Sequence, residues 1–326
     1  MIRTGVIGVG YMGQNHVRIY SEISDLVGIY DVDIDHSRAV ARRFGTQVFE
    51  KIEDLIQKVD AVSICTPTVD HFDSTLMALK AGKSVLLEKP FTGDSGKASL
   101  LANEAEKQDV VLAGGFVERF NPVVSAAKEA LEVGRFGKII SISSKRVSSF
   151  PSRIRDVGVI MDLAIHDVDV IRYITSSEII GVFGMGGKFA NDRFEDYANL
   201  LLELECGVTG HVETNWLTPM KVRKVSMTCS KGYVQLDYID QVLEISSSEV
   251  REIDPGNLFQ VPLEFDVRRL SLKKEEPLKR ELQDFLAAVR SSGKPKVTAS
   301  DAIMDLKVCE AAIRSVREKR KIEIAH

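Results

Sequence analysis

Three glycines with the spacing GxGxxG, Gly8, Gly10 and Gly13, come directly after an apolar run near the start of the chain. A pattern typical of an amphipathic helix follows, so the glycines lie where a first strand passes into a first helix. Gly8 permits a tight turn, Gly10 lets the backbone approach a pyrophosphate, and Gly13 lets the helix pack on the strand. The phosphates would meet the unpaired N–H groups at the helix start. The pattern therefore predicts a dinucleotide site that includes Tyr11 and Met12.

An acidic residue, Asp31, lies eighteen residues after Gly13, at the end of the second apolar run, Leu26–Tyr30. A carboxylate at this place can accept hydrogen bonds from both hydroxyls of an adenosine ribose, and it would repel a 2′-phosphate. The alternative is that Asp31 only caps a turn. Together with the glycine turn, it indicates NAD as the cofactor in preference to NADP.

Composition excludes several classes of protein. A chain of 326 residues fits about two domains. The net charge of −4 gives no sign of a nucleic-acid partner, and no apolar stretch reaches the ~18 residues that a membrane span needs. We expect a cytoplasmic location, because the sequence opens without the pattern of a signal peptide. Isolated cysteines argue against a disulfide framework and a zinc site, so no metal is expected; they are Cys65, Cys206, Cys229 and Cys309.

Apolar runs alternate with helical patterns from residue 1 to about 118. Strands that are apolar throughout and separated by helices are typical of a parallel sheet covered on both faces. We therefore expect an α/β Rossmann domain, with a doubly wound parallel sheet, over residues 1–118. Its expected strands are Ile2–Val9, Leu26–Asp31, Asp60–Cys65, Ser84–Glu88 and Val110–Gly114.

The pattern changes after Phe120-Asn121-Pro122. One helix over residues 123–133 is followed by strand candidates with stronger alternation and short links, which favours a mainly antiparallel open sheet. We expect a C-terminal α+β domain over residues 119–326, with an irregular segment at 254–274 and two closing helices, Pro277–Arg290 and Ser300–Lys319. Its expected strands are Ile139–Val147, Ala198–Glu205, Val208–Asn215, Val222–Cys229 and Val242–Ile245.

Lys89 lies at the end of the fourth expected strand, in Glu88-Lys89-Pro90. Ligands of open α/β sheets bind beyond the carboxyl ends of the strands, so this side chain would face the cofactor cleft. An ammonium there can orient a substrate hydroxyl and stabilise an alkoxide, and a neutral amine can take a proton. A Lys-Pro pair alone is more often part of a solvated loop, but the Rossmann context favours the functional interpretation.

A second candidate group is Asp162, His166 and Asp169, which share one face if the segment is an α-helix. A carboxylate one turn away can orient the histidine as the base for a secondary alcohol. Two alternatives stay open. Asp162 could cap the helix beside an ordinary buried histidine, or the pair could bind a metal, although two ligands are too few for a closed site.

Four cations fall within eleven residues just before that helix: Lys145, Arg146, Arg153 and Arg155. The donor fork of arginine suits phosphate or carboxylate. The group is either a solvated basic loop or a binding site for an anionic substrate such as a nucleotide sugar.

Taken in order, these motifs resemble the glucose–fructose oxidoreductase and inositol dehydrogenase family (Gfo/Idh/MocA) over almost the whole chain. The resemblance implies an N-terminal Rossmann domain and a C-terminal α+β domain. The open sheet of the second domain would form a homodimer or homotetramer, and the last helix, about residues 300–319, would pack back on the first domain. The resemblance to this family rests on the glycine turn, Cys65-Thr66-Pro67-Thr68 with His71, Glu88-Lys89-Pro90, Glu118-Arg119-Phe120-Asn121-Pro122, Gly158–Asp162 leading to His166, and Val297–Lys319.

Carried over position by position, the resemblance implies roles for particular residues. The catalytic residues would be Lys89, Asp162 and His166. The residues near the cofactor would be Thr66, Pro67 and His71, with Glu88 and Lys89 beside the nicotinamide and Arg119 close to the junction of cofactor and substrate.

Within the family, the chain resembles UDP-N-acetylglucosamine 3-dehydrogenases in the segments 117–122, 145–147 and 152–158. This implies that His166, oriented by Asp162, removes the proton of a sugar 3-hydroxyl while Lys89 stabilises the oxyanion; the roles of Lys89 and His166 could be exchanged. Three alternatives remain: a dehydrogenase of an uncharged sugar or inositol, a glycosidase that uses bound NAD, and an NAD-binding regulator without turnover.

Overall fold

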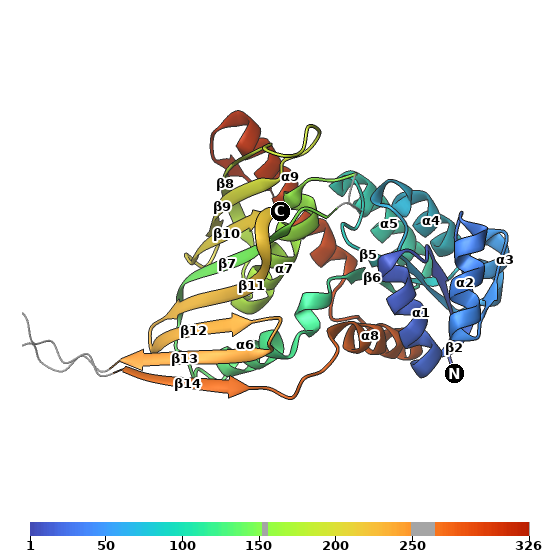
Figure 1. The fold of residues 1–326 in the computed structure, drawn as a ribbon, viewed down its shortest axis with the longest axis horizontal. Helices are drawn as coiled ribbons and strands as arrows, with labels where there is room; N and C mark the ends of the chain where they lie inside the picture. Colours follow the sequence, from blue (N-terminus) through green and yellow to red (C-terminus); the bar gives the residue numbers. More distant parts are fainter. Residues whose placement is uncertain (152–155, 249–264, 326) are drawn as a thin grey trace, which may run out of the picture.

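The computed structural model describes residues 1–151, 156–248 and 265–325. It consists of two sheets, each with its own helices, that lie side by side (Figure 1). No helix in these ranges combines the length and the apolar character needed to cross a membrane.

The first sheet has six strands among the described residues, in the order β3-β2-β1-β4-β5-β6, and every neighbouring pair is parallel. The central strands β4 and β5 are buried along their whole length, because helices cover both faces. This confirms the predicted Rossmann sheet. The strands are β1 (Arg3–Ile7), β2 (Asp25–Tyr30), β3 (Gln47–Val48), β4 (Ala61–Ile64), β5 (Ser84–Glu88) and β6 (Leu112–Gly115).

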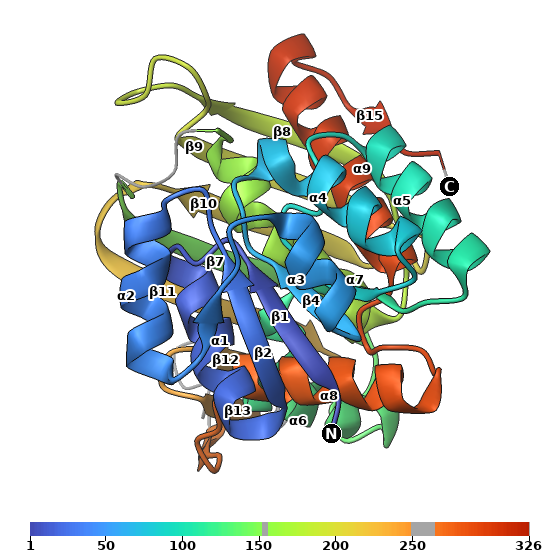
Figure 2. The same ribbon diagram turned by 90° about the vertical axis from the view of Figure 1, so that its right-hand side faces the viewer.

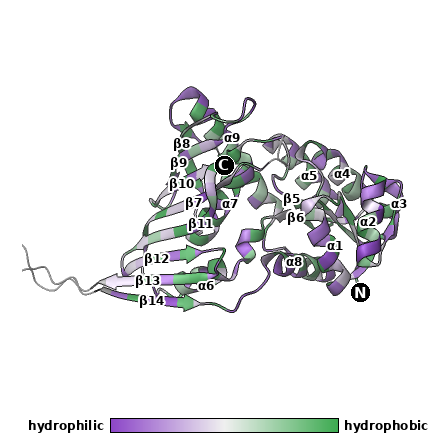
Figure 3. Cartoon of the chain, in the orientation of Figure 1, coloured by the Kyte–Doolittle hydropathy of each residue, from purple (hydrophilic) through white to green (hydrophobic). Residues whose placement is uncertain are grey.

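Five helices alternate with these strands. The direction of winding changes between the adjacent strands β1 and β4, and such a switch point is where open α/β sheets bind ligands. The outer helices carry alternating polar and apolar stripes, as helices with one buried side do (Figure 3). They are α1 (Tyr11–Ile23), α2 (Ile34–Phe44), α3 (Ile52–Lys58), α4 (Thr68–Lys80) and α5 (Ser95–Gln108).

The second sheet has the order β14-β13-β12-β11-β7-β10-β9-β8-β15. All neighbours are antiparallel except β7 and β10, so the predicted mainly antiparallel sheet is confirmed. The sequence pattern missed β8, in which four glycines interrupt the alternation, and the short β12. The strands are β7 (Ile139–Ser149), β8 (Ile179–Gly187), β9 (Tyr197–Leu204), β10 (Thr209–Asn215), β11 (Leu217–Cys229), β12 (Gly232–Asp237), β13 (Val242–Ser248), β14 (Phe265–Ser271) and β15 (Ile322–Glu323).

The expectation of an irregular segment at 254–274 is wrong for its second half, where β14 forms seven pairs with β13. Residues 254–264 of that segment lie outside the described residues. The strand was missed because its residues Asp266, Arg268 and Arg269 give it a charged, weakly alternating pattern.

Helices cover one face of the second sheet, the face turned toward the first sheet (Figure 1). Residues of β9 alternate strictly between buried and exposed, so the other face is open. The covering elements are the 3₁₀ turn η1 (Val117–Phe120), α6 (Pro122–Glu132), the π-helical turn η2 (Ile160–Ala164), α7 (Ile165–Thr175) and α9 (Ala299–Glu318).

The last two helices join the two sheets. Helix α8 (Pro277–Ser291) packs on α1 (Figure 2). Its side chains Leu282 and Phe285 belong to the same apolar cluster as Val6 of β1 and Val17 of α1. Helix α9 contacts α5, β6, α7 and β8. Its Glu310 accepts hydrogen bonds from both the backbone N–H and the hydroxyl of Ser95, each at 2.7 Å. The two sheets are therefore tied on two sides of the space between them.

Candidate active site

A cavity of about 1130 Å³ lies between the two sheets, at the switch point of the first. Sites for one small molecule usually have volumes of ~300–1,000 Å³, so this cavity is larger than one such ligand needs. The first wall comprises its lining residues before residue 100, among them Gly8, Gly10, Tyr11, Met12, Asp31, Thr66, Pro67, Glu88 and Lys89. The second wall comprises those after residue 116, among them Glu118, Asp162, His166, Lys221, Arg223 and Tyr238.

The glycine turn has the geometry that a dinucleotide phosphate requires. Gly8 has a φ of +83°, and a Cβ there would lie 2.7 Å from the backbone nitrogen of Thr66. A Cβ on Gly13 would lie 1.9 Å from the carbonyl oxygen of Gly8, whereas the space next to Gly10 is open. Helix α1 begins at Tyr11 with no side-chain cap and no acidic residue in its first turn. These features fit the phosphates of NAD.

Asp31 follows β2 and lines the cavity beside the glycine turn. Its Oδ2 accepts a hydrogen bond from the backbone N–H of Val9 at 2.7 Å, and its Oδ1 accepts one from Asp33 at 2.9 Å. The two bonds fix the carboxylate at the rim, where it fits the ribose of an adenosine.

Thr66 and Pro67 line the cavity just after β4, but His71 is not among the lining residues. The His71 ring is buried behind the wall, and its two nitrogens lie 2.9 Å from the carbonyl oxygens of Pro90 and Thr66. Burial lowers the pKa of His71. This histidine therefore braces the two loops that carry Thr66 and Lys89.

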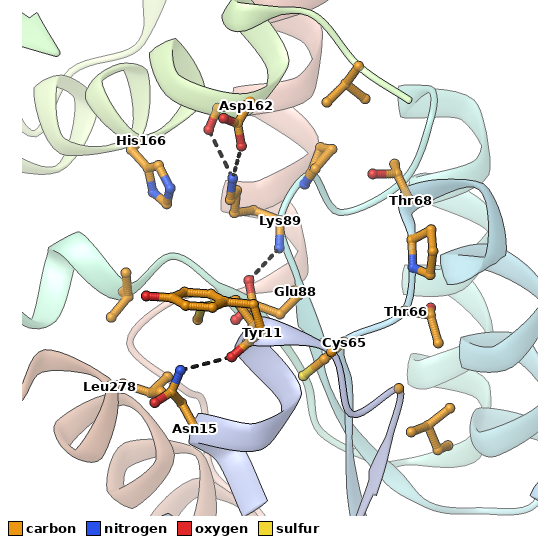
Figure 4. Close-up of a pocket in the computed structure, with 18 of the residues that line it drawn as sticks. Tyr11, Asn15, Cys65, Thr66, Thr68, Glu88, Lys89, Asp162, His166 and Leu278 are labelled. Atoms are coloured by element: carbon orange, nitrogen blue, oxygen red, sulfur yellow. Dashed lines mark hydrogen bonds and ion pairs between the residues drawn. The ribbon is translucent and has the colours of Figure 1, made fainter. Parts of the chain in front are cut away.

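Lys89 joins the two walls. Its Nζ donates to the Oδ1 of Asp162 at 2.7 Å and to the Asp162 carbonyl at 2.9 Å (Figure 4). Glu88 lies below it, where its Oε2 accepts from the Lys89 backbone N–H at 3.2 Å and its Oε1 lies 3.1 Å from Nε2 of His16. The ammonium is thus held at the carboxyl end of β5, as the sequence predicted for this residue.

His166 lies in the first turn of α7, with its ring toward the space near Lys89 (Figure 4) and edge-on to Phe116. Burial lowers the pKa of His166 well below 6.5, and the positive charges of Lys89, Arg146 and Arg223 lower it further. Its Nδ1 is buried and has no hydrogen-bond partner among the described residues. The ring is therefore neutral near pH 7 and able to accept a proton.

The expected alignment of Asp162, His166 and Asp169 on one helix face is wrong. Asp162 belongs to η2, a π-helical turn with wider spacing than an α-helix, so positions four residues apart do not stack. Its carboxylate bonds to Lys89 instead of His166. Asp169 is turned away and accepts from Arg119 at 2.7 Å. No group of three potential metal ligands comes together in the described part of the chain.

The structure places Arg119 away from the cavity, contrary to the expected position at the junction of cofactor and substrate. Its buried guanidinium bonds to Asp169 and lies 3.2 Å from Asp301 of α9. Burial lowers the pKa of Arg119, but these carboxylates outweigh burial and hold it above the ordinary value. Arg119 therefore ties η1 to α7 and α9.

The predicted group of substrate cations is also not assembled as expected. Lys145 and Arg146 are consecutive residues of β7, so their side chains point to opposite faces of the sheet. Lys145 pairs with Glu213 at 2.9 Å on the open face, and Arg146 is buried against Asp167 and Glu118. Neither lines the cavity. The other two members, Arg153 and Arg155, lie outside the described residues.

Two other cations, Lys221 and Arg223, line the second wall, and the sequence analysis did not select them. They are two residues apart at the start of β11, so their side chains share a face. That spacing is visible in the sequence, but the expected strand began at Val222, and nothing local shows which face meets the cavity. Tyr238 and Glu118 lie on the same wall.

Comparisons with known proteins agree with this geometry. The model of the oxidoreductase family with an NAD-binding Rossmann fold matches residues 2–116, and that of the Gfo/Idh/MocA C-terminal domain matches residues 124–235. UDP-N-acetylglucosamine 3-dehydrogenase of Acidithiobacillus ferrooxidans is 31% identical over 313 residues, 96% of each chain. Its solved structure has a TM-score of 0.88 at 29% identity and covers 97% of this chain and 98% of its own.

Other relatives act on different substrates. Myo-inositol 2-dehydrogenase of Thermotoga maritima is 29% identical over 338 residues, 99% of this chain and 98% of the relative. Levoglucosan dehydrogenase in complex with NADH shares the fold, with a TM-score of 0.86 at 18% identity and coverage of 100% of this chain and 99% of that chain. The chain therefore belongs to the Gfo/Idh/MocA family of oxidoreductases and is an NAD-dependent dehydrogenase that acts on a sugar or polyol hydroxyl.

Proposed function

We propose that this chain oxidises the 3-hydroxyl of UDP-N-acetylglucosamine to the 3-keto sugar. The observation that carries the proposal is the composition of the cavity: Lys89 of the first wall meets Asp162 near His166 of the second wall, and the cations Lys221 and Arg223 also line the second wall. The 31% identity with UDP-N-acetylglucosamine 3-dehydrogenase over nearly the full length of both chains supports it.

Each of the three residues has a role that follows from its surroundings. His166 is neutral, so it takes the proton of the substrate hydroxyl. Lys89 stabilises the negative charge that develops on the substrate oxygen. Asp162 holds the Lys89 ammonium with two hydrogen bonds and thereby fixes its direction. The sequence left the roles of Lys89 and His166 exchangeable, and the neutral ring of His166 favours this assignment.

The cofactor belongs beside the first wall. NAD, when bound, would supply the acceptor for the hydride of the substrate carbon, and His166 would take the O–H proton, so that one hydride and one proton are removed. The start of α1 holds the phosphates, and Asp31 holds the adenosine ribose. Thr66, Pro67, Glu88 and Lys89 line the cavity between those two groups and the second wall.

The test is NADH formation with purified protein, NAD and one candidate substrate at a time. We expect absorbance at the NADH band with UDP-N-acetylglucosamine, strengthened by an aminotransferase that removes the ketone. Myo-inositol and free N-acetylglucosamine serve as uncharged comparison substrates. Oxidation of myo-inositol alone would replace the proposal with the activity of the Thermotoga maritima relative, and release of free sugar without NADH would indicate a glycosidase.

We also propose that a cytoplasmic homodimer or homotetramer forms through the open face of the second sheet. That face exposes apolar side chains on several strands, among them Met185 on β8, Leu201 on β9 and Tyr233 on β12. Their burial against a second copy would remove apolar surface from water. Light scattering tests this: Leu201→Glu should lower the molar mass of the particle, and an unchanged mass would contradict the proposal.

A further inference from the structure

Arg223 has an unusual position for a half-buried arginine. Strands β7 and β11 are antiparallel, and their register places Arg223 directly opposite Arg146. Like charges in directly opposed positions repel. One oxygen, Oε1 of Glu118, lies between them and accepts from Arg146 at 2.9 Å and from Arg223 at 3.3 Å. A pair of guanidinium groups therefore shares this carboxylate.

The other carboxylate nearby, that of Asp167, does not neutralise the charge of Arg223. Asp167 accepts two hydrogen bonds from Arg146, at 2.8 and 3.2 Å, and one from the hydroxyl of Ser144 at 2.6 Å. The other oxygen of Glu118 accepts from Asn121 at 3.3 Å. The negative charge in this network is thus directed mainly to Arg146.

The pKa values of Arg223 and of three buried arginines show the same imbalance. Burial lowers the pKa of Arg119, Arg146 and Arg172, but their carboxylate partners outweigh burial and raise each pKa above its ordinary value. The pKa of Arg223 is lowered, first by burial and then by the charge of Arg146. Its positive charge is therefore under-compensated, and an anion beside it would be stabilised.

The under-compensated charge faces the cavity. Arg223 and Lys221 both line the second wall, and the side chain of Arg223 is 32% exposed. Tyr238 lines the same wall, and its backbone N–H donates to the carbonyl of Arg223 at 3.1 Å. The Tyr238 hydroxyl is buried without a hydrogen-bond partner among the described residues. Asp162, the acid on this wall that faces Lys89, is already paired with it.

We propose that Lys221 and Arg223 bind the diphosphate of a nucleotide-sugar substrate, an inference that rests on the proposed function. Arg223 supplies a planar set of N–H donors that suits phosphate oxygens, and Lys221 adds a second charge from the same face of β11. Glu118 acts as the positioning residue, since its bond to Arg223 fixes the direction of the guanidinium.

The test is the affinity for UDP, measured by calorimetry on the protein saturated with NADH. Saturation keeps UDP out of the dinucleotide site. Arg223→Gln should weaken UDP binding about 10- to 100-fold, because a charge-assisted hydrogen bond is lost, and Lys221→Gln should weaken it less. Lys224→Gln is the matched control, since Lys224 is on the opposite face of β11, pairs with Asp237 and does not line the cavity.

The outcomes separate this inference from the proposed function. Unchanged UDP affinity in Arg223→Gln, with normal NADH affinity and normal melting temperature, overturns the inference even if UDP-N-acetylglucosamine is oxidised. Weaker UDP binding in Arg223→Gln and not in Lys224→Gln supports it. If wild-type protein binds UDP with this dependence but leaves UDP-N-acetylglucosamine unoxidised, the diphosphate site stands and the proposed function fails. A wild-type protein that does not bind UDP overturns the inference.

Discussion

The two walls of the cavity are built in different ways. The first wall consists of short segments that each follow a strand of one parallel sheet, so β1, β2, β4 and β5 deliver the glycine turn, Asp31, Thr66 and Lys89 to one edge. The second wall consists of side chains that are distant in sequence. Glu118 comes from η1, His166 from α7 and Arg223 from β11. Hydrogen bonds to Glu118 from Arg146 and Arg223 join β7 and β11 to η1.

The difference matters because we propose different tasks for the two walls. A dinucleotide is the same molecule throughout a large class of enzymes, and backbone geometry at a helix start is enough to hold its phosphates. A substrate site has to distinguish between sugars. Side chains on a sheet can be exchanged without disturbing the backbone, and the 31% and 29% identical relatives with different substrate names are consistent with variation at this wall.

The largest effect is expected where the walls meet. Lys89→Ala removes the cation that bonds to Asp162, and it should reduce kcat by about 10²- to 10⁴-fold while NADH still binds. Steady-state kinetics and a fluorescence titration with NADH measure the two quantities. Lys107→Ala, an exposed lysine of α5, is the control. Loss of NADH binding together with turnover would show that Lys89 belongs to the cofactor site alone.

A large effect on stability is expected behind the second wall. Asp167→Asn keeps the size of the side chain but leaves Arg146 with less compensation in a buried place, so the free energy of unfolding should fall by about 3–5 kcal/mol. Arg3→Gln breaks an exposed pair with Asp60 at the amino end of the first sheet and should cost about 0–1 kcal/mol. Urea unfolding measures the loss in the free energy of unfolding for both variants. Similar losses would mean that the second wall does not depend on its buried charges.

The sequence predicted more of the first wall than of the second. The physical reason is that the residues of the second wall depend on partners that are distant in the sequence. The glycine turn and Lys89 are local patterns whose meaning depends only on a strand that precedes them, and they lie as expected. The places of Arg119 and Arg146 depend on partners 50 and 21 residues away, Asp169 and Asp167, which no local pattern reveals. The π-helical turn that directs Asp162 to Lys89 also has no local signal, because its residues read as ordinary helix.

Cofactor choice should be sensitive to one residue of the first wall. Asp31→Asn removes the charge that would repel a 2′-phosphate, so the preference for NAD over NADP should fall about 10- to 100-fold. The ratio of kcat/KM for the two cofactors measures this. Asp35→Asn, an exposed acid in the first turn of α2, is the matched control. An unchanged ratio in Asp31→Asn would show that Asp31 only shapes the turn through its bonds to Val9 and Asp33.

The smallest effect is expected in the pH dependence, and it sharpens the comparison most. A base with the ordinary histidine pKa of about 6.5 would lose about fourfold in kcat/KM between about pH 7.5 and pH 6. Burial and the charges of Lys89, Arg146 and Arg223 lower the pKa of His166 well below that value, so the ring stays neutral as the pH falls through 6.5. The profile should therefore be nearly flat over this interval, with the loss at lower pH.

The variant Arg223→Gln tests whether the charges of the second wall act on His166 or only make separate contacts. The variant removes one of the positive charges that lower the pKa of His166, so the acid limb should move to higher pH. Lys224→Gln, on the other face of the strand, should leave the limb in place. The pH profile of kcat/KM for both variants measures the shift. A wild-type limb near pH 6.5, or equal limbs in the two variants, would remove His166 from the role of base in this charged surrounding.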